Sequence, residues 1–448
     1  MELFGTAGIR GSVTERVTPE LALSVGRAAG VDGDEFVVAR DGRVTGPALA
    51  AAMEAGLESA GATVHRAGML PTPALAFASQ GRRGVMLTAS HNPPTDNGIK
   101  VFDDGVEYAR EAEQAIEERV EAGASPVAWD EWGGGDEVEP LAAYRSAVTD
   151  FASTRGADLD GLRVAVDCGN GMGALATPQV LRELGAQVVT LNANVDGHFP
   201  GRESKPTPET LSDLREFVAD GEFAFGLGHD GDADRIVIID GDGEVVHEDT
   251  VLAILAEHYV RSEDVADPVV VTTPNASARI DERVRAAGGR VERVRLGALH
   301  EGIASARADG GDVVFAAEPW KHIHVPFGGW IDGVTSAAVV GRLVADVGLD
   351  ALREPVTERP YRKVSVECPD TAKATVMETV ATTLPDAFPD AEVDTEYGVR
   401  LEFPDASWTL VRPSGTEPYV RIYAESDEVD GLVADVRAVV DEAVADAA

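Results

Sequence analysis

Lysine is scarce in this chain of 448 residues, where it occurs five times among 38 basic residues. Acidic residues number 78, which gives a formal net charge of −40. Such a surface repels the phosphates of nucleic acids and the headgroups of anionic membranes, so we expect neither as a partner. The acids are spread along the whole chain instead of forming a tail. This pattern indicates a halophilic protein that works in molar salt, where repulsion between like charges is screened.

Cysteine and long apolar runs are also rare. The two cysteines, Cys168 and Cys368, lie far apart and offer neither a disulfide framework nor a metal-binding cluster. No apolar run reaches the roughly 18 residues of a membrane span, and the first residues lack the basic and apolar regions of a secretory signal. We therefore expect a cytoplasmic protein. Whether it is a monomer or a homodimer is left open.

Apolar segments of strand length alternate with helical patterns over most of the chain. The predicted strands lie at 36–41, 84–89, 162–167, 186–191, 222–230, 268–273, 290–296 and 312–318. This alternation predicts largely parallel sheets covered by helices. After residue 355 the pattern changes to a mixed sheet with helices packed on it, the last of them at 428–446.

Length and these changes of pattern together predict four domains. The fold class we expect is α/β, with three consecutive mixed α/β domains plus a C-terminal α+β domain. A Trp- and Gly-rich segment at 129–140 marks the first linker region. The expected domains are 1–149, 150–250, 251–354 and 355–448. In sheets of this kind, ligands bind at loops that leave the carboxyl ends of strands.

A run of aspartates follows the predicted strand at 222–230. In DGDADR, Asp230, Asp232 and Asp234 occupy alternate positions, and Arg235 ends the run. Three carboxylates on one turn suit a hard cation such as Mg²⁺, and the arginine suits a neighbouring phosphate. A calcium-binding EF-hand loop is excluded, because arginine stands where that loop needs glycine, and glycine where it needs glutamate. A solvated acidic turn is the alternative.

The segment RPSGTEP is suited to binding an anion. Arg412 supplies positive charge, while Ser414, Gly415 and Thr416 present hydroxyl and backbone N–H groups on a tight turn. Arg421, a few residues further on, adds a second positive charge. An ordinary glycine-containing turn between two strands is the alternative.

Ser90 stands in TASHNPPTDNGIK, a loop stiffened by two consecutive prolines. A hydrolytic serine would need a G-x-S-x-G elbow, which is missing, and the adjacent His91 is poorly placed to take its proton. A phosphorylated serine fits better, because it carries about −1.5 to −2 charges and therefore needs a cation partner. In the N-terminal segment FGTAGIRG, Thr6 and Arg10 could bind a phosphate or orient such a nucleophile.

A dinucleotide-binding turn is a competing interpretation of VAVDCGNGMGA. Gly169, Gly171 and Ala174 form G-x-G-x-x-A after a predicted strand. The acidic residue expected about 20 positions later is missing, since the next strand ends in Asn192. We interpret the segment as a structural turn between strand and helix.

Taken together and in this order, FGTAGIRG, TASHNPP, DGDADR and RPSGTEP resemble the motifs of the four-domain α-D-phosphohexomutase family. That family includes phosphoglucomutases, phosphomannomutases and phosphoglucosamine mutases. The resemblance extends from Phe4 to the C-terminal domain. It implies four domains around a central cleft, and a phosphoserine that exchanges its phosphoryl group with a sugar phosphate.

The resemblance also implies roles for individual residues. Ser90 matches the phosphoserine, and Lys100, in NGIK, matches a position suspected of general acid–base catalysis. The implied catalytic residues are Ser90, Lys100, His91 and Arg10. The implied Mg²⁺ ligands are Ser90, Asp230, Asp232 and Asp234. The implied substrate contacts in these motifs are Thr6, Arg235, Arg412, Ser414, Gly415, Thr416 and Arg421.

One motif departs from the family pattern. The sugar-recognition loop usually reads Gly-Glu-x-Ser-Gly-His, whereas residues 317–322 read AEPWKH. Glu318 and His322 are retained, but Trp320 replaces the serine and Lys321 the glycine. In the family the Glu and Ser contact sugar hydroxyls, so the identity of the sugar is left open. Trp320 could stack on a sugar face or pack between domains, and Lys321 could meet a phosphate.

The activity implied is reversible phosphoryl transfer within a sugar phosphate. A hexose 1-phosphate (glucose, mannose or glucosamine) would become the 6-phosphate by way of phosphoserine and a sugar 1,6-bisphosphate, which acts as intermediate and activator. The altered loop makes a phosphopentomutase one alternative. A non-catalytic sugar-phosphate sensor on the same scaffold is another.

Overall fold

The computed structural model describes residues 3–5, 8–414 and 417–447. The chain divides into two compact units. The first is formed by Met1–Glu248 with Trp320–Leu352, and the second by Asp249–Pro319 with Arg353–Ala448. Among the described residues, no helix is long and apolar enough to cross a membrane.

The first sheet of the first unit is mixed. Its strands follow the order β1-β5-β4-β2-β3-β7, and β6 pairs with β5. In that unit β2, β3, β4 and β7 pair in parallel, whereas β5 pairs antiparallel with β1, β4 and β6. The loop between β4 and β5 is too short for a helical crossover, so these strands must run antiparallel. The strands are β1 Ile9–Ser12, β2 Glu35–Arg40, β3 Thr63–Met69, β4 Arg83–Leu87, β5 Asp96–Asp103, β6 Val106–Glu107 and β7 Gly135–Glu137.

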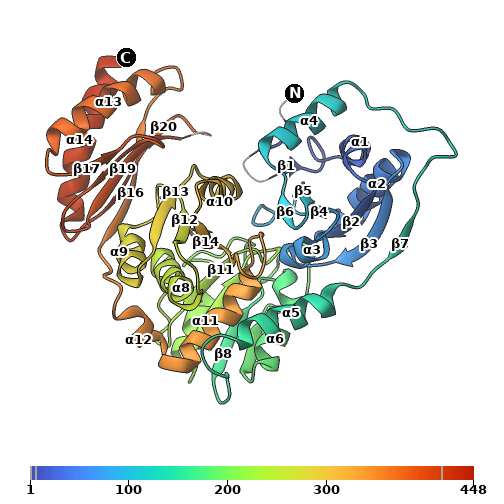
Figure 1. The fold of residues 1–448 in the computed structure, drawn as a ribbon, viewed down its shortest axis with the longest axis horizontal. Helices are drawn as coiled ribbons and strands as arrows, with labels where there is room; N and C mark the ends of the chain where they lie inside the picture. Colours follow the sequence, from blue (N-terminus) through green and yellow to red (C-terminus); the bar gives the residue numbers. More distant parts are fainter. Residues whose placement is uncertain (1–2, 6–7, 415–416, 448) are drawn as a thin grey trace. The chain divides into compact units, whose positions relative to one another are not determined.

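Four helices accompany this sheet: α1 Pro19–Ala29, α2 Gly46–Ser59, α3 Thr72–Ala78 and α4 Arg110–Glu121, with a 3₁₀ turn at Gly30–Asp32. The hydroxyl of Thr18 caps α1 by accepting from Leu21 N–H at 3.3 Å. Helices α1 and α2 lie side by side (Figure 1). They approach closely because both carry glycine there: a Cβ on Gly26 would stand 2.4 Å from the Met53 carbonyl oxygen.

The second sheet of the first unit has the order β11-β10-β8-β9. Strands β8, β9 and β10 are parallel, and β11 joins β10 antiparallel through the tight loop of the DGDADR motif. The strands are β8 Arg163–Asp167, β9 Gln187–Leu191, β10 Phe225–His229 and β11 Ile236–Ile239, and β15 Lys321–Ile323 is a further short strand of this unit. The helices are α5 Leu141–Ser153, α6 Thr177–Glu183, α7 Ser212–Ala219, α11 Gly333–Val347 and α12 Leu349–Arg353, with a 3₁₀ turn at Met172–Leu175.

The second unit contains a parallel sheet in the order β13-β12-β14 and an antiparallel sheet in the order β16-β20-β19-β18-β17. Helices α13 and α14 lie side by side on the antiparallel sheet (Figure 1). The strands are β12 Pro268–Thr272, β13 Arg290–Arg293, β14 Asp312–Glu318, β16 Tyr361–Glu367, β17 Glu392–Asp394, β18 Val399–Glu402, β19 Trp408–Pro413 and β20 Tyr419–Glu425. The helices are α8 Glu248–Ser262, α9 Ala278–Ala287, α10 Leu299–Ala308, α13 Lys373–Ala387 and α14 Val429–Ala447.

The predicted fold class is confirmed, since mixed α/β sheets precede a C-terminal domain with an antiparallel sheet and two helices. Two details differ from the prediction. The early sheets are less parallel than expected, because short connections turn β5 and β11 back along their neighbours. The C-terminal sheet is antiparallel throughout, not mixed. The predicted boundaries of the four domains stay a prediction.

Candidate active site

Ser90 lies in the loop that follows β4 and is fully buried. Its Oγ donates to Asp230 Oδ2 at 2.7 Å and lies 3.3 Å from His91 Nδ1. Its backbone is left-handed, with φ of 51°, which is costly for a residue other than glycine. The prolines shape the rest of the loop, where Asp96 N–H donates to the Pro93 carbonyl oxygen at 3.1 Å. The structure therefore places the hydroxyl of the predicted nucleophile, Ser90, at hydrogen-bond distance from Asp230, the first of the predicted metal ligands.

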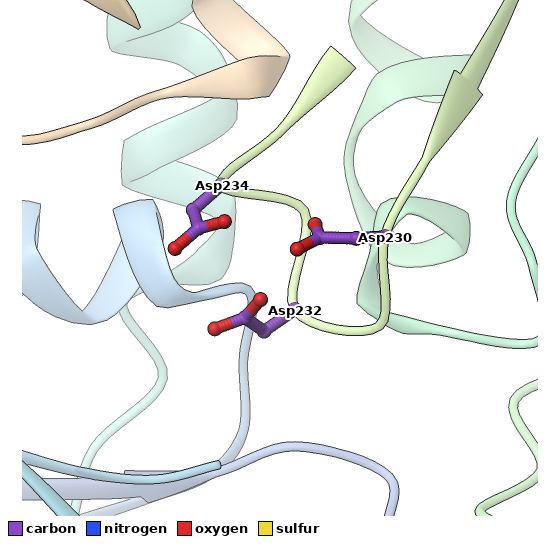
Figure 2. A group of neighbouring side chains, drawn as sticks. All are labelled: Asp230, Asp232 and Asp234. Atoms are coloured by element: carbon purple, nitrogen blue, oxygen red, sulfur yellow. The ribbon is translucent and has the colours of Figure 1, made fainter. Parts of the chain in front are cut away.

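The three aspartates occupy the loop between β10 and β11, and their carboxylates point toward one another (Figure 2). One oxygen from each lies within 4.8 Å of the others, and all three side chains are buried. Gly231 sits between the first two because a Cβ there would stand 2.5 Å from the Ser90 carbonyl oxygen. The close approach of this loop to the serine loop thus depends on that glycine.

These buried carboxylates carry strongly perturbed pKa values. Burial, followed by repulsion from Asp234 and Asp232, raises the pKa of Asp230 well above its ordinary value. Burial acts in the same direction on Asp234, but nearby cations, with Lys100 and Arg235 the strongest, hold the pKa of that carboxyl well below its ordinary value. A site in which one carboxylate is destabilised by its neighbours is suited to a bound cation.

Whether a divalent metal fits the cluster can be judged from the carboxylate oxygens that accept no hydrogen bond from the described residues. Thr72 Oγ1 donates to Asp232 Oδ2 at 2.6 Å, which orients that carboxylate. Asp232 Oδ1 and Asp234 Oδ1 are buried, and no described residue donates a hydrogen bond to either. A hard cation such as Mg²⁺ takes oxygen ligands of this kind, so the residues present fit the metal predicted from the sequence.

The predicted cations of the first unit surround this cluster. Lys100, buried on β5, has its Nζ 3.1 Å from Asp234 Oδ2 and 3.1 Å from Glu107 Oε1. Burial tends to lower the pKa of Lys100, but Glu107 and Asp234 raise it above its ordinary value. Arg235 Nε lies 3.7 Å from Asp230 Oδ2.

Two further predicted residues lie beside these cations. Arg10, on β1, lies opposite Gly98 of β5. Burial, together with the charges of Arg235 and Arg10, lowers the pKa of His91 to about 2. His91 is therefore neutral, and it is a weak base at Ser90.

The departing loop AEPWKH is divided between the two units. In the first unit, Trp320 has φ of 70° and is half-buried against the apolar cluster of the second sheet, which includes Leu211 and Ile239. Lys321 forms an antiparallel bridge with Arg235, which sets it beside the aspartate loop.

His322 is the last residue of this loop in the first unit. It is buried and lies 3.0 Å from Ser336 Oγ through Nδ1, and burial lowers its pKa to about 3. In the second unit, Glu318 Oε1 accepts from Gly297 N–H at 2.5 Å.

The anion-binding segment lies in the second unit, where β19 turns into β20. Arg412 and Arg421 are paired across these strands, and both are half-buried. Arg412 Nη2 donates to Tyr423 Oη at 3.0 Å, and Ser414 N–H donates to the Tyr419 carbonyl oxygen at 2.8 Å. Three predicted contact residues, Thr6, Gly415 and Thr416, lie outside the described residues.

The motifs did not identify three of the residues that contact the predicted site residues: Thr72, Glu107 and Lys373. Thr72 and Glu107 reach Asp232 and Lys100 from segments with no recognised motif. Lys373 Nζ donates to the carbonyl oxygens of Ser414 and Glu417, both at 2.6 Å. Lysine occurs only five times in the chain. This scarcity makes each lysine a candidate site residue, and Lys373 could have been identified in that way.

Family models described as phosphoglucomutase/phosphomannomutase match residues 1–126 (alpha/beta/alpha domain I), 142–243 (alpha/beta/alpha domain II) and 364–443 (C-terminal domain). A phosphopentomutase of Thermococcus kodakarensis is 44% identical over 436 residues, covering 95% of this chain and 94% of that protein. A probable phosphoglucosamine mutase of Methanopyrus kandleri is 43% identical over 435 residues, with coverage of 95% and 94%.

Among solved structures, a phosphoglucomutase/phosphomannomutase family protein of Burkholderia thailandensis matches with a TM-score of 0.87 at 26% identity, covering 99% of this chain and 97% of that one. The fold and these relatives put the chain in the class of phosphosugar mutases, which are isomerases. Within that class it belongs to the phosphoglucomutase/phosphomannomutase family, as its four motifs implied.

Proposed function

We propose that this protein moves a phosphoryl group between two oxygens of one sugar phosphate by way of phospho-Ser90. The observation that carries the proposal is the hydrogen bond of 2.7 Å from Ser90 Oγ to Asp230 within a buried cluster of three carboxylates. A hydroxyl in this setting is suited to carrying phosphate next to a divalent cation.

The proposed metal is Mg²⁺, held by Asp230, Asp232, Asp234 and the phosphorylated Ser90. The proximity and burial of these carboxylates support it, as do the two carboxylate oxygens without a hydrogen-bond donor among the described residues. When bound, the metal supplies positive charge that offsets the charge on the transferring phosphoryl group.

The chain's own residues hold and stabilise the transferring group. In the forward half-reaction the Ser90 Oγ–P bond breaks as a bond forms from phosphorus to a sugar hydroxyl oxygen, and the proton of that hydroxyl ends on Ser90 Oγ. The second half-reaction returns the other phosphate of the sugar 1,6-bisphosphate to Ser90. We assign Lys100, Arg10 and Arg235 to charge stabilisation around this step, because they surround the carboxylate cluster with positive charge. His91 adjoins the nucleophile as a neutral group.

The proposed substrate is a hexose phosphate, with glucose, mannose or glucosamine as the sugar. Its non-reacting phosphate would be held by Arg412, Ser414, Gly415, Thr416 and Arg421, while Thr6, Glu318, Trp320, Lys321 and His322 would complete the contacts. The relative named probable phosphoglucosamine mutase supports this choice. A pentose phosphate is the second candidate, because Trp320 and Lys321 alter the sugar-recognition loop and another relative is named phosphopentomutase.

The test is a ³¹P NMR turnover panel in molar KCl with Mg²⁺ and a trace of the matching bisphosphate. Glucose, mannose, glucosamine and ribose 1-phosphates are offered separately. Conversion of a hexose phosphate would identify the sugar, and conversion of ribose 1-phosphate alone would make this a phosphopentomutase. No conversion of any, by a folded protein, would favour the sugar-phosphate sensor. An activity maximum at low ionic strength would remove the proposed halophilic adaptation.

Replacement of the nucleophile gives a sharper test. Ser90→Ala should lower turnover by at least about 1000-fold, because the covalent carrier is lost. Ser79→Ala is the matched control, since Ser79 is also a buried serine of the first unit and its hydroxyl bonds only a local carbonyl. Intact-mass measurement after incubation with glucose 1,6-bisphosphate should show one added phosphate on the wild type and the Ser79 variant. Full activity of Ser90→Ala would refute the phosphoserine.

A further inference from the structure

Arg43, which follows β2, directs its side chain into the loop of Ser90 and is 1% exposed. A guanidinium has five N–H groups, and four of them donate to backbone carbonyl oxygens of this one loop. Nη1 donates to Pro93 at 2.6 Å and to Asp96 at 2.9 Å. Nη2 donates to Ser90 at 3.0 Å and to Asn92 at 2.8 Å. Few side chains could satisfy so many carbonyls of one loop at once.

The fifth N–H, on Nε, donates to Asp41 Oδ2 at 3.0 Å. That same oxygen accepts from Thr88 Oγ1 at 2.8 Å, and Thr88 Oγ1 in turn accepts from Ser90 N–H at 2.9 Å. Both backbone groups of Ser90 are therefore fixed by one connected set, which we call the Arg43 clamp (Arg43, Asp41 and Thr88). A left-handed residue such as Ser90 persists only where its surroundings hold it in this way.

The loop that follows β9 packs against the clamp. The Phe199 ring centroid lies 5.1 Å from Arg43 Cζ, and a Cβ on Gly197 would stand 2.7 Å from the Arg43 Cα. Charge-assisted hydrogen bonds are stronger where water is excluded, so this enclosure strengthens the clamp.

We propose that Arg43 is the positioning residue that keeps the Ser90 hydroxyl in place through both half-reactions. The proposal rests on the function proposed above. Ser90 Oγ alternates between a free hydroxyl and a phosphate ester, beside carboxylates that repel the phosphate. Among the residues that the structure describes, the Arg43 side chain donates to Asp41 and to the backbone of the serine loop alone, so it acts through Ser90 and not on the substrate. The clamp resists movement of the loop as the charge on the serine changes.

The decisive variant is Arg43→Lys, which keeps the positive charge but loses the planar set of five donors. Arg342→Lys is the matched control in the same unit. Arg342 is buried and donates to the carbonyl oxygens of Arg155 at 2.7 Å and Ser153 at 3.0 Å, in a loop that carries no predicted site residue. Both substitutions therefore remove a buried arginine that holds backbone carbonyls, and only one of them touches the serine loop.

Two measurements are made on the full chain. The first is turnover of the four sugar 1-phosphates used above. Arg43→Lys should lower kcat by about 100-fold, since a small displacement of a nucleophile has an effect of this size, while KM should change by less than about threefold because substrate binding is untouched. The second is hydrogen exchange at the Ser90 amide, which should quicken by about tenfold or more as its hydrogen bond weakens. Arg342→Lys should leave both readouts within about twofold of the wild type.

The possible outcomes separate the two proposals. If Arg43→Lys matches Arg342→Lys in both kcat and exchange, the clamp is refuted. If the wild type neither phosphorylates Ser90 from glucose 1,6-bisphosphate nor converts any sugar phosphate, the proposed function fails, and the exchange comparison still decides whether Arg43 fixes the loop. If Arg43→Lys does not fold, Thr88→Val is used to decide whether the clamp positions Ser90. This variant removes only the hydroxyl that links Asp41 to the Ser90 amide. It should lower kcat by about tenfold and quicken exchange at Ser90. Wild-type values for Thr88→Val would overturn the proposal.

Discussion

The loop of Ser90 in the first unit and the turn between β19 and β20 in the second differ in charge, burial and support. Ser90 and its three aspartates are buried and mostly negative, and side chains from distant segments fix them. The strands on either side of the turn carry Arg412 and Arg421, which are half-buried and paired across β19 and β20.

This difference follows from what each region is proposed to do. A reacting phosphoryl group needs a nucleophile fixed to within a fraction of an ångström, which only many buried contacts can provide. A non-reacting phosphate needs charge and donors, which a hairpin with two arginines supplies while remaining open to water. Substitutions in the first region should therefore change kcat, and substitutions in the second should change KM.

Among the substitutions that test this difference between the two regions, Asp230→Asn should have the largest effect. Loss of one carboxylate from the cluster should lower kcat by about 1000-fold, as loss of a key electrostatic contact does elsewhere. The metal-free protein should nevertheless become more stable, with Tm rising by roughly 2–4 °C, because repulsion and burial already disfavour the charge of this group. Thermal unfolding in EDTA measures this. Asp242→Asn, on an exposed turn, is the control. A lower Tm for Asp230→Asn without metal would contradict the account of the buried cluster.

Arg412→Met tests the other side of the comparison. Because a charged hydrogen bond to phosphate is lost, KM should rise by about 30-fold, while kcat stays within about threefold. Arg437→Met, on the exposed face of α14, is the control and should change neither constant. Steady-state kinetics on the preferred sugar phosphate provide both numbers. A large fall in kcat with unchanged KM would mean that this arginine acts at the reacting centre.

A smaller effect is expected from Lys373→Met. Lys373 holds both ends of the turn by donating to the carbonyl oxygens of Ser414 and Glu417. Its loss should loosen the turn and raise KM by about five- to tenfold. Lys363→Met is the matched control, because the Nζ of that lysine lies 5.6 Å from the Tyr423 ring centroid, whereas the carbonyl oxygens of Ser414 and Glu417 accept from Lys373. Equal effects of the two variants would show that total charge matters here and local support does not.

Much of the fold could be predicted because strand and helix patterns are local. The strands before Ser90 and Asp230 were found from short apolar runs that end in chemically distinctive loops. The sequence did not predict that β5 pairs antiparallel with β4. The direction of pairing depends on the connection between the two strands and not on their composition. The clustering of the three aspartates could be predicted because they are neighbours in sequence.

The residues that support the site could not be predicted, because they meet it only in the folded chain. Arg43 stands 47 positions before the Ser90 whose carbonyl it binds, and Thr72 stands 160 positions before Asp232. The local sequences DGRVTG and LPTP do not indicate that Arg43 will face backbone carbonyls or that Thr72 will face a carboxylate. A buried arginine is nevertheless expensive to desolvate, so its presence indicates a demanding set of acceptors once burial is known.

The smallest effect concerns pH, and it depends on Asp41. Burial raises the pKa of Asp41 from 3.8 to about 6, although Arg43 and Thr88 lower it, and Asp232 raises it further. Between those values the native state holds a proton that the unfolded state has released. The free energy of unfolding should therefore fall as pH rises toward about 6, by up to ~1.4 kcal/mol per unit.

Denaturant unfolding in molar KCl from pH 5 to pH 7 measures this slope. Asp41→Asn should make the slope shallower, because the amide does not titrate, while Asp230, whose pKa is also raised by burial, keeps its own contribution. Arg412→Met should keep the slope, since a guanidinium stays charged throughout this range. The contrast between the two regions would then extend to pH, because the carboxyl of Asp41 belongs to the set of side chains that holds the serine loop. An unchanged slope in Asp41→Asn would assign the titration to another buried carboxyl and separate the pH response from the Arg43 clamp.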